Sequence, residues 1–276
     1  FFENKNVKQT VLKNTVWLSF GTLFGRTIKA ILIIYIARML GAAGYGVFSY
    51  VLNIAALFTI FSDIGISPIL TREASRSPEN LKKFLSTSLV IKLALLALGT
   101  LLIVFVAPPF TGISEAIPLL PLAALLAIFD GLREFTFSIT RSREKMQTES
   151  IVNVITNVAI AALGVFVLAT RPTGQNLLIA YTLGSGTGMA ISFFILRNDF
   201  RGILSFFDRT IIKKIIVEAW PFAIGGILGS LMINTDTLMI GWLKEAVDVG
   251  FYSAAQRPIQ LLYIFPALFS VGLFPT

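Results

Sequence analysis

Two basic side chains inside an apolar segment are the residues whose type and spacing most directly suggest chemistry. Arg26 and Lys29 lie in the hydrophobic run 14–39, three residues apart, so a helix places both on one face. Counted from Lys13 at 1.5 Å per residue, they lie about 20–24 Å along the helix, beyond the middle of a ~30 Å bilayer core. Two neighbouring cations there require an anion, and the planar guanidinium group suits a phosphate. We therefore expect Arg26 and Lys29 to bind an anionic ligand.

A carboxylate of the protein itself is the alternative anion. Asp63 lies in the next apolar run, 45–71, about one helical turn deeper than Arg26. This depth allows Asp63 to pair with Arg26, but one carboxylate leaves the second cation, Lys29, uncompensated. The sequence leaves ligand binding and internal pairing open, and it also leaves Asp63 open as a carboxylate that couples transport to an ion.

A second candidate pair lies toward the end of the chain. Asp236 precedes Leu243 by seven residues and Arg257 follows Gly250 by seven residues, so the two lie at equal depth on either side of a predicted turn. We expect them to form an ion pair inside the membrane. The alternatives are a coupling-ion carboxylate at Asp236 and a second anion-binding arginine at Arg257.

The composition excludes whole classes of site. Residues 1–276 contain neither cysteine nor histidine, which rules out thiol chemistry, histidine acid–base catalysis and metal sites built from those ligands. Only 14% of the residues are charged, 55% are hydrophobic and the mean hydropathy is +0.80, whereas a soluble domain carries about 25% charged residues. We therefore expect an all-α polytopic membrane protein with no catalytic residue, no metal and no cofactor.

Membrane-spanning helices must position these residues. Apolar runs of about 20 residues, long enough to cross a bilayer, recur along the whole chain. We predict eight of them, at about 14–39, 45–71, 84–107, 117–138, 149–169, 177–196, 218–243 and 250–275. The loops carry fifteen Lys and Arg residues on one side and two on the other, which predicts a multi-pass protein of the plasma membrane with a cytoplasmic N-terminus. The net charge of +8 then reflects topology and requires no nucleic acid.

The other charged residues within the spans, and their glycines, are expected to serve the structure of the helices rather than to bind a substrate. Arg38 and Arg133 lie close enough to predicted span ends for their long side chains to reach the interface, and Lys92, about nine residues inside the third span, is expected to reach it in part. Asp130, Arg133 and Glu134, near the cytoplasmic end of the fourth span, are expected to line a gate rather than a substrate site. Three small-xxx-small patterns predict faces of close helix packing: Gly21 with Gly25, Gly184 with Gly188, and Gly225 with Gly229.

A short internal repeat indicates a chain built from two similar parts. Residues 44–49 and 248–253 align at an offset of 204 residues, which matches Gly46 with Gly250. Six predicted spans separate the two copies, so both copies have the same orientation, as in transporters made of parallel repeats.

The repeat predicts a division of the chain. We expect residues 1–204 to form a first six-helix bundle, and residues 205–276 to hold an interfacial helix and the start of a second, pseudo-symmetric bundle that is truncated. Alternating apolar and charged pairs in 205–217 indicate a short helix in the cytoplasmic interface, and a cytoplasmic extension of the seventh span fits the same pattern. The chain begins without Met and stops inside an apolar run, so we expect a fragment of a longer protein.

Four stretches resemble the polysaccharide flippases of the multidrug/oligosaccharidyl-lipid/polysaccharide exporter superfamily. They are Leu-Gly-Ala-Ala-Gly-Tyr-Gly-Val-Phe-Ser at 40–49, Phe-Ser-Asp-Ile-Gly-Ile with Thr-Arg-Glu within 61–73, Pro-Phe with Ile-Asn-Thr-Asp-Thr-Leu-Met-Ile-Gly within 221–241, and Val-Gly-Phe-Tyr-Ser-Ala-Ala at 249–255. The resemblance covers nearly the whole chain and rests on the order and spacing of these stretches. It implies two six-helix bundles around a central cavity, of which this chain would hold the first bundle and two helices of the second.

The resemblance also implies a function. Such flippases move a polyprenyl-phosphate-linked oligosaccharide from the cytoplasmic to the outer leaflet by alternating access, for the synthesis of surface polysaccharide. Related flippases of lipid-linked peptidoglycan precursors bind the lipid diphosphate with arginines of the first and eighth helices, and the comparable residues here are Arg26 and Arg257. The implied partners are the lipid-linked substrate, membrane lipid, and polysaccharide polymerase or glycosyltransferases, with no nucleic acid.

Two other functions compete with a flippase. A drug or cation antiporter of the same superfamily would favour carboxylates in its cavity, whereas the first span has two cations and no acid. A membrane-embedded glycosyltransferase or ligase would need a soluble face with metal-binding carboxylates, and the longest predicted loop has only about 20 residues. The sequence favours the flippase and leaves its sugar and its driving force open.

Overall fold

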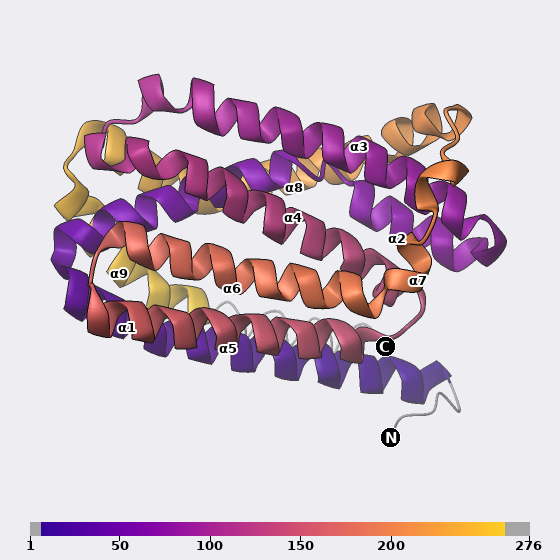
Figure 1. The fold of residues 1–276 in the computed structure, drawn as a ribbon, viewed down its shortest axis with the longest axis horizontal. Helices are drawn as coiled ribbons and strands as arrows, with labels where there is room; N and C mark the ends of the chain where they lie inside the picture. The colour runs from indigo at the N-terminus through magenta and orange to yellow at the C-terminus, as the bar shows by residue number, and fades with distance from the viewer. Residues whose placement is uncertain (1–6, 263–276) are drawn as a thin grey trace.

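The computed structural model describes residues 7–262, and every long element in that range is an α-helix (Figure 1). The helices are α1 (Val7–Phe61), α2 (Ile66–Arg76), α3 (Leu81–Leu101), α4 (Leu120–Ser142), α5 (Met146–Thr170), α6 (Gly174–Ile195), α7 (Arg197–Phe200), α8 (Thr210–Leu243) and α9 (Ala246–Leu262). Within the described range, six segments are long and apolar enough to cross a membrane, and the first, Lys13–Thr59, contains the first predicted span and most of the second. The prediction of an all-α polytopic membrane protein is confirmed. The last predicted span, 250–275, lies partly outside the described residues.

α1 is a hairpin of two legs. Gly41 has φ 66° and ψ 179°, which glycine adopts without steric cost, and it separates the two legs. The second leg ends at Phe61, because Ile64 and Gly65 have φ of 37° and 82° and turn the chain before α2 begins. The prediction of a continuous second span is therefore wrong, and Asp63 lies in the break.

The two ends of the bundle differ in composition (Figure 1). The start of α1 and the connections α2–α3, α4–α5 and α6–α8 lie at one end, which we call the basic end because these connections are rich in Lys and Arg. The kink of α1, the connection α3–α4 and the turn between α8 and α9 lie at the other end, which we call the turn end. The connections rich in Lys and Arg therefore lie together at one end of the bundle, as the loop charges predicted.

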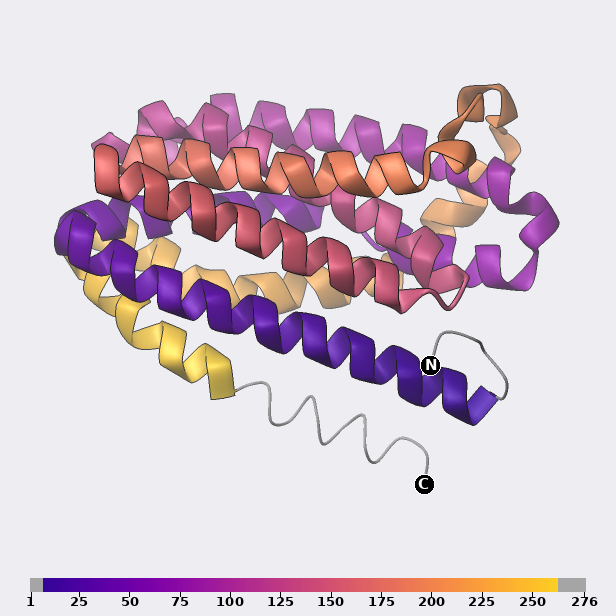
Figure 2. The same cartoon turned by 60° about the horizontal axis from the view of Figure 1, so that its bottom comes forward.

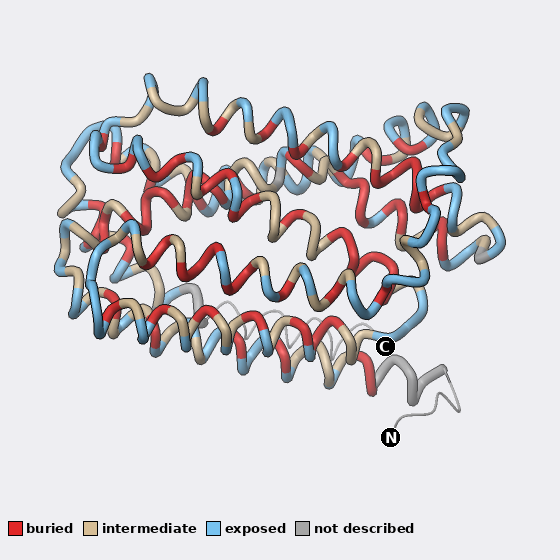
Figure 3. Tube along the Cα trace, viewed as in Figure 1, coloured by how far each residue is buried: buried red, intermediate tan, exposed pale blue. Residues whose placement is uncertain are grey.

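The outer surface of the bundle is apolar. Along each helix, buried and exposed residues alternate around the axis (Figure 3). The exposed positions include large hydrophobic side chains such as Phe166, Phe194 and Met232, which are 66%, 67% and 81% exposed. Surface of this kind is unfavourable in water and favourable against lipid chains, which is consistent with a bilayer around these helices.

α5 is held between two glycine faces, one from each neighbouring helix. A Cβ atom added at Gly21 or Gly25 of α1 would overlap side chains of α5, and so would one added at Gly184 or Gly188 of α6. The α5 residues at these contacts are Ser150, Asn157, Ile160 and Thr156. Two of the three predicted faces of close packing are therefore confirmed, and they fix α1, α5 and α6 as one layer of the bundle (Figure 2).

The two copies of the internal repeat contact each other at the turn end. A Cβ atom at Gly46 in α1 would overlap the carbonyl oxygen of Ala246 in α9, and one at Gly250 in α9 would overlap the carbonyl oxygen of Ala42. These two contacts exchange under the 204-residue offset, because it maps Ala42 onto Ala246 and Gly46 onto Gly250. Such reciprocity characterises a two-fold contact between like parts. Glycine at both positions allows the two backbones to approach this closely.

The same offset extends the repeat beyond the turn. It maps Gly21 onto Gly225 and Gly25 onto Gly229. In α1 this glycine pair packs on α5, whereas in α8 no described atom lies within 4 Å of a Cβ added at either glycine. The third predicted packing face is therefore open in the described range. The repeat comprises a whole hairpin, and the division of the chain into two bundles stays a prediction.

α8 extends the seventh predicted span into the basic end. It begins at Thr210 and runs unbroken to Leu243, so residues 210–217 form the first turns of α8 and not a separate interfacial helix. Of the two interpretations that the sequence left open, the structure shows the extension.

An ion-pair network joins this extension of α8 to α2. Lys214 Nζ lies 2.5 Å from Glu73 Oε2. Arg72 pairs with Glu73 and also with Glu218, one helical turn after Lys214. The hydrogen bond from Lys214 holds the pKa of the Glu73 carboxyl below its usual value. The basic end of α8 is therefore fixed to α2 by charge, whereas the turn end is fixed by glycine contacts.

Replacing either glycine of the reciprocal contact should destabilise the protein. We expect Gly46→Ala and Gly250→Ala each to cost about 1–3 kcal/mol, because a methyl group must displace backbone. The double variant should cost less than the sum, since one separation of the two helices relieves both clashes. The melting temperature of the full-length protein purified in detergent measures this.

Gly99→Ala is the matched control, because an added Cβ there meets only the Phe58 carbonyl oxygen at 3.9 Å. It should keep or slightly raise the melting temperature, since alanine favours a helix by about 0.5–1 kcal/mol over glycine. Strictly additive losses at Gly46 and Gly250 would contradict a shared contact.

Candidate functional site

Basic side chains from three helices converge around Lys29. Electrostatic interactions link its ammonium group to Arg26 on α1, to Asp130 and Arg133 on α4, and to Arg257 on α9. We call these five residues the cationic cluster. Arg26 and Lys29 are both exposed residues of α1. The structure therefore brings together the three residues predicted to bind substrate and adds two from α4.

The carboxylate of the cationic cluster is already engaged by the protein. Asp130 Oδ1 lies 2.8 Å from Arg133 Nη2 and accepts a hydrogen bond of 2.5 Å from Ser185 Oγ on α6. Arg133 Nη1 donates to the same Ser185 Oγ at 3.3 Å. Within the cluster, four cations thus face one carboxylate. A surplus of positive charge among apolar helices is costly unless an anion or water compensates it.

Arg133 is the functional residue whose place the sequence predicted wrongly. The fourth span was predicted to end at 138, close enough for the side chain to reach the interface, but α4 continues to Ser142. Arg133 therefore lies nine residues, about 14 Å, inside the helix end. Asp130 three residues earlier was the available signal, because the i, i+3 spacing pairs the two within the span. Both residues belong to the cationic cluster, and their role in a gate stays a prediction.

Asp63 pairs with Lys92 of α3 and not with Arg26 or Lys29 of α1. Its Oδ2 lies 3.0 Å from Lys92 Nζ on α3 and accepts a hydrogen bond of 2.5 Å from Ser67 Oγ, while its Oδ1 accepts one of 3.0 Å from the Ser67 backbone N–H. The Lys92 side chain is 1% exposed, so the prediction that it reaches the interface is wrong. Asp63 is thus neutralised by Lys92 and caps the start of α2, and the alternative of an Arg26–Asp63 pair loses its basis.

Asp236 lies on an exposed position of α8. Its Oδ2 accepts a hydrogen bond of 2.6 Å from the Tyr252 hydroxyl group on α9. Arg257, one and a half turns further along α9, is half-buried and interacts electrostatically with Lys29 and with the buried Tyr181 of α6. The ion pair of Asp236 with Arg257 stays a prediction. The electrostatic interaction of Arg257 with Lys29 supports the alternative prediction that Arg257 is a second anion-binding arginine.

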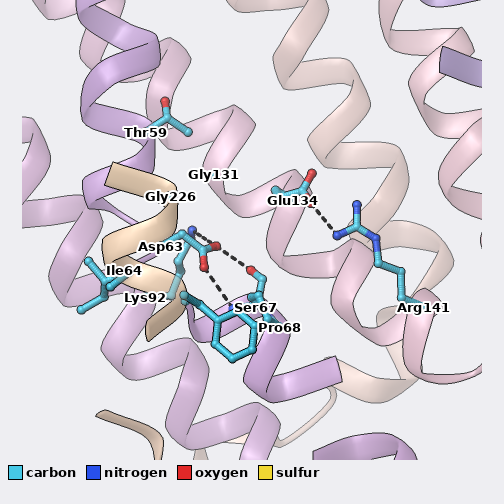
Figure 4. A pocket seen from close by; sticks show the side chains of 13 residues that line it. Thr59, Asp63, Ile64, Ser67, Pro68, Lys92, Gly131, Glu134, Arg141 and Gly226 are labelled. Atoms are coloured by element: carbon cyan, nitrogen blue, oxygen red, sulfur yellow. Dashed lines mark hydrogen bonds and ion pairs between the residues drawn. The ribbon is translucent and has the colours of Figure 1, made fainter. Parts of the chain in front are cut away.

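A cavity of about 320 Å³ opens beside the Asp63–Lys92 pair (Figure 4). It lies between the break after α1, helices α3 and α4, and the α8 segment around Phe222. Glu134 on α4 also lines it, and Glu134 Oε1 lies 2.8 Å from Arg141 Nη1. Arg141 is held in turn by both oxygens of Glu149, at 2.8 and 2.6 Å. Glu134 therefore belongs to this cavity and not to the cationic cluster.

Replacing the Asp63 carboxylate should leave the buried Lys92 ammonium group without its counter-ion. We expect Asp63→Asn to lower stability by on the order of 3 kcal/mol, because the Lys92 ammonium loses its counter-ion. Asp63→Asn combined with Lys92→Met should recover most of the loss. Protein abundance and melting temperature of the full-length protein are the measurements.

Asp199→Asn provides the comparison at the surface, where the partner Arg143 is 36% exposed and can be hydrated. It should change stability by less than about 1 kcal/mol. A double variant as unstable as Asp63→Asn alone would show that Asp63 acts through Ser67 and not through Lys92.

Two solved structures share the fold of this chain. A chain named "protein A" superposes with a TM-score of 0.75 at 16% identity, covering 94% of this chain and 62% of that one. The MATE multidrug transporter DinF-BH superposes with a TM-score of 0.70 at 18% identity, covering 91% and 60%. At these identities the likeness establishes the fold alone.

Sequence comparison identifies the family. The "Putative O-antigen transporter" of Shigella flexneri is 23% identical over 284 residues, which cover 96% of this chain and 66% of that protein, so the chain spans just under two thirds of this relative. The family model described as "Polysaccharide biosynthesis protein" matches residues 11–276. This match confirms the resemblance predicted from the sequence: the chain belongs to the polysaccharide biosynthesis protein family.

Proposed function

We propose that this chain forms the ligand-binding part of a flippase that moves a polyprenyl-phosphate-linked oligosaccharide from the cytoplasmic to the outer leaflet by alternating access. The product would feed the synthesis of surface polysaccharide, next to polymerase or glycosyltransferases. Family membership and the transporter name of the Shigella flexneri relative support a transport role. The lipid-linked substrate is inferred from the chemistry of the cationic cluster.

The charge of the cationic cluster is the observation that carries the proposal. Lys29 lies among Arg26, Arg133 and Arg257, and Asp130 is the carboxylate among them. A diphosphate offers several anionic oxygens in a small volume, and arginine binds such oxygens with two parallel hydrogen bonds. The exposed face of Arg26 and Lys29 leaves room for a ligand.

The competing functions account less well for this charge. A carrier of cationic drugs would require carboxylates where Arg26 and Lys29 stand, although the fold is shared with a multidrug transporter. A glycosyltransferase or ligase would need an acid, a base or a metal at the reacting bond. Among residues 7–262, no group of three acidic side chains is placed to hold a metal. We therefore propose binding and movement of the lipid rather than its chemical conversion.

The proposed direction of movement requires the basic end to face the cytoplasm of the cell, with the protein in the plasma membrane. Because residues 1–276 contain no cysteine, single cysteines report the side on which they lie. Cysteines at Ser114 and Gln175, both exposed at the turn end, should react with an impermeant thiol reagent added to intact cells. A cysteine at Ser77, at the basic end, should react only after the membrane is opened. Labelling of Ser77→Cys in intact cells would reverse the orientation.

Arg26 should be required for flipping but not for folding. We expect Arg26→Ala to lower flipping of the lipid-linked oligosaccharide tenfold or more, since a bidentate contact with phosphate is worth roughly 1.5–3 kcal/mol. Arg26→Lys should restore it partly, because a point charge replaces a planar fork. Flipping is measured by the surface exposure of the lipid-linked oligosaccharide, normalised to the amount of full-length protein.

Arg38→Ala is the control within the same leg of α1. Arg38 is also exposed but lies twelve residues, about 18 Å, toward the turn end. It should flip at the wild-type rate. Equal damage from Arg38→Ala, or a loss of protein in Arg26→Ala that matches the loss of flipping, would remove the ligand-binding role of Arg26.

A further inference from the structure

The cavity beside the Asp63–Lys92 pair has a charge pattern unlike that of the cationic cluster. Two cations and two carboxylates line it, and they form two pairs, Asp63 with Lys92 and Glu134 with Arg141. A phosphate would repel the carboxylates here, and an organic cation would meet Lys92 and Arg141. The cavity is therefore suited to a ligand without net charge.

The polar groups of the cavity remain available to such a ligand. The side chains of Asp63, Arg141 and Glu134 are 22%, 33% and 46% exposed although each is paired. A carboxylate oxygen accepts more than one hydrogen bond, and a guanidinium group has five N–H donors. Hydroxyl groups, which both donate and accept, can bind to all three without breaking the pairs.

Part of the cavity lining is apolar. Phe222 on α8 is 47% exposed, and Ile64 and Pro68 lie near it on the segment that follows α1. Phe222 lines the same cavity as Asp63 and Ser67, which Figure 4 labels. An aromatic ring facing paired polar side chains fits a molecule with an apolar face and a polar rim. A sugar ring has this construction, with C–H groups on its face and hydroxyl groups at its edge.

The cavity also adjoins the cationic cluster along α4. Glu134 and Gly131 line the cavity, whereas Asp130 and Arg133 belong to the cluster. Asp130 and Glu134 are four residues apart, about 6 Å along the helix. In a glycolipid diphosphate, the first sugar is bonded directly to the outer phosphate. A diphosphate in the cluster would therefore place that sugar next to Glu134, on the side of the basic end.

We propose that this cavity is a sugar subsite, which binds the sugar attached to the diphosphate while the cationic cluster binds the diphosphate itself. This proposal rests on the proposed function and makes it more specific. At 320 Å³ the cavity is near the lower limit of small-molecule pockets, about 300–1,000 Å³, so it holds the beginning of the glycan and not its full length. The cavity thus selects for a glycosylated lipid over the bare carrier lipid.

Two lipid probes separate the sugar subsite from the diphosphate site. Polyprenyl diphosphate and polyprenyl diphosphate carrying a single N-acetylhexosamine are titrated against the full-length protein in nanodiscs, and dissociation constants are measured. We expect the wild type to bind the glycosylated lipid about tenfold more tightly than the bare lipid. Phe222→Ala and Glu134→Gln should each remove most of this difference and keep the affinity for the bare lipid. Glu134→Gln leaves Arg141 paired with Glu149, so folding is retained.

Control variants distinguish the two sites. Phe166→Ala removes an exposed phenylalanine of α5 that does not line this cavity, and it should change neither affinity. Arg26→Ala should weaken both lipids equally. Ala223→Phe, which fills the cavity from α8, should weaken only the glycosylated lipid.

Each alternative result identifies the assignment that fails. Binding of the bare lipid that depends on Arg26, combined with no gain from the sugar in the wild type, would overturn the sugar subsite and leave the proposed function intact. The sugar subsite is likewise overturned if Phe222→Ala and Glu134→Gln change both affinities by the same factor. If neither lipid binds to the wild type, both the sugar subsite and the proposed function are overturned.

Discussion

Close contact between helix backbones at glycine is the interaction on which the rest of this structure depends. Lipid chains are as apolar as leucine, so burial from water cannot hold helices together within a bilayer, and tight packing at small residues must do so. Gly21 and Gly25 bring α5 against the first leg of α1, and Gly46 with Gly250 brings α9 against its kink. These contacts fix α1 while Arg26 and Lys29 of the same leg stay exposed.

Charge is distributed in two different ways inside this scaffold. Lys92 and Arg141 are each held by carboxylates, so the helices around the Asp63–Lys92 cavity carry paired charges that need no ligand. The cationic cluster instead places Arg26, Lys29, Arg133 and Arg257 around Asp130. In the proposed function, the diphosphate of the ligand supplies negative charge to this cluster, because unbalanced charge is unfavourable among apolar helices.

The internal repeat shows which of these features belongs to the scaffold. The 204-residue offset maps Gly21, Gly25 and Gly46 onto glycines, but it maps Arg26 onto Ser230 and Lys29 onto Ile233. The packing positions are thus kept in both copies, whereas Arg26 and Lys29 have no cationic counterpart in the second copy. The cationic cluster is therefore asymmetric although the helix packing is repeated. The cations that complete the site come from α4 and α9 instead of the repeated position.

The sequence by itself determined the helical class, most of the spans and the shared face of Arg26 and Lys29. These follow from hydrophobic length and from a period of 3.6 residues, which are local properties of the chain. Two of the three glycine faces were predictable for the same reason. Only the tertiary structure decided the partners: Asp63 with Lys92, 29 residues away, and Arg133 with Lys29 from different helices. The helical period predicts the direction of a side chain but not the helix that it contacts. A helix that ends a few residues later than predicted can also keep a charged side chain inside the bundle that was expected to reach water.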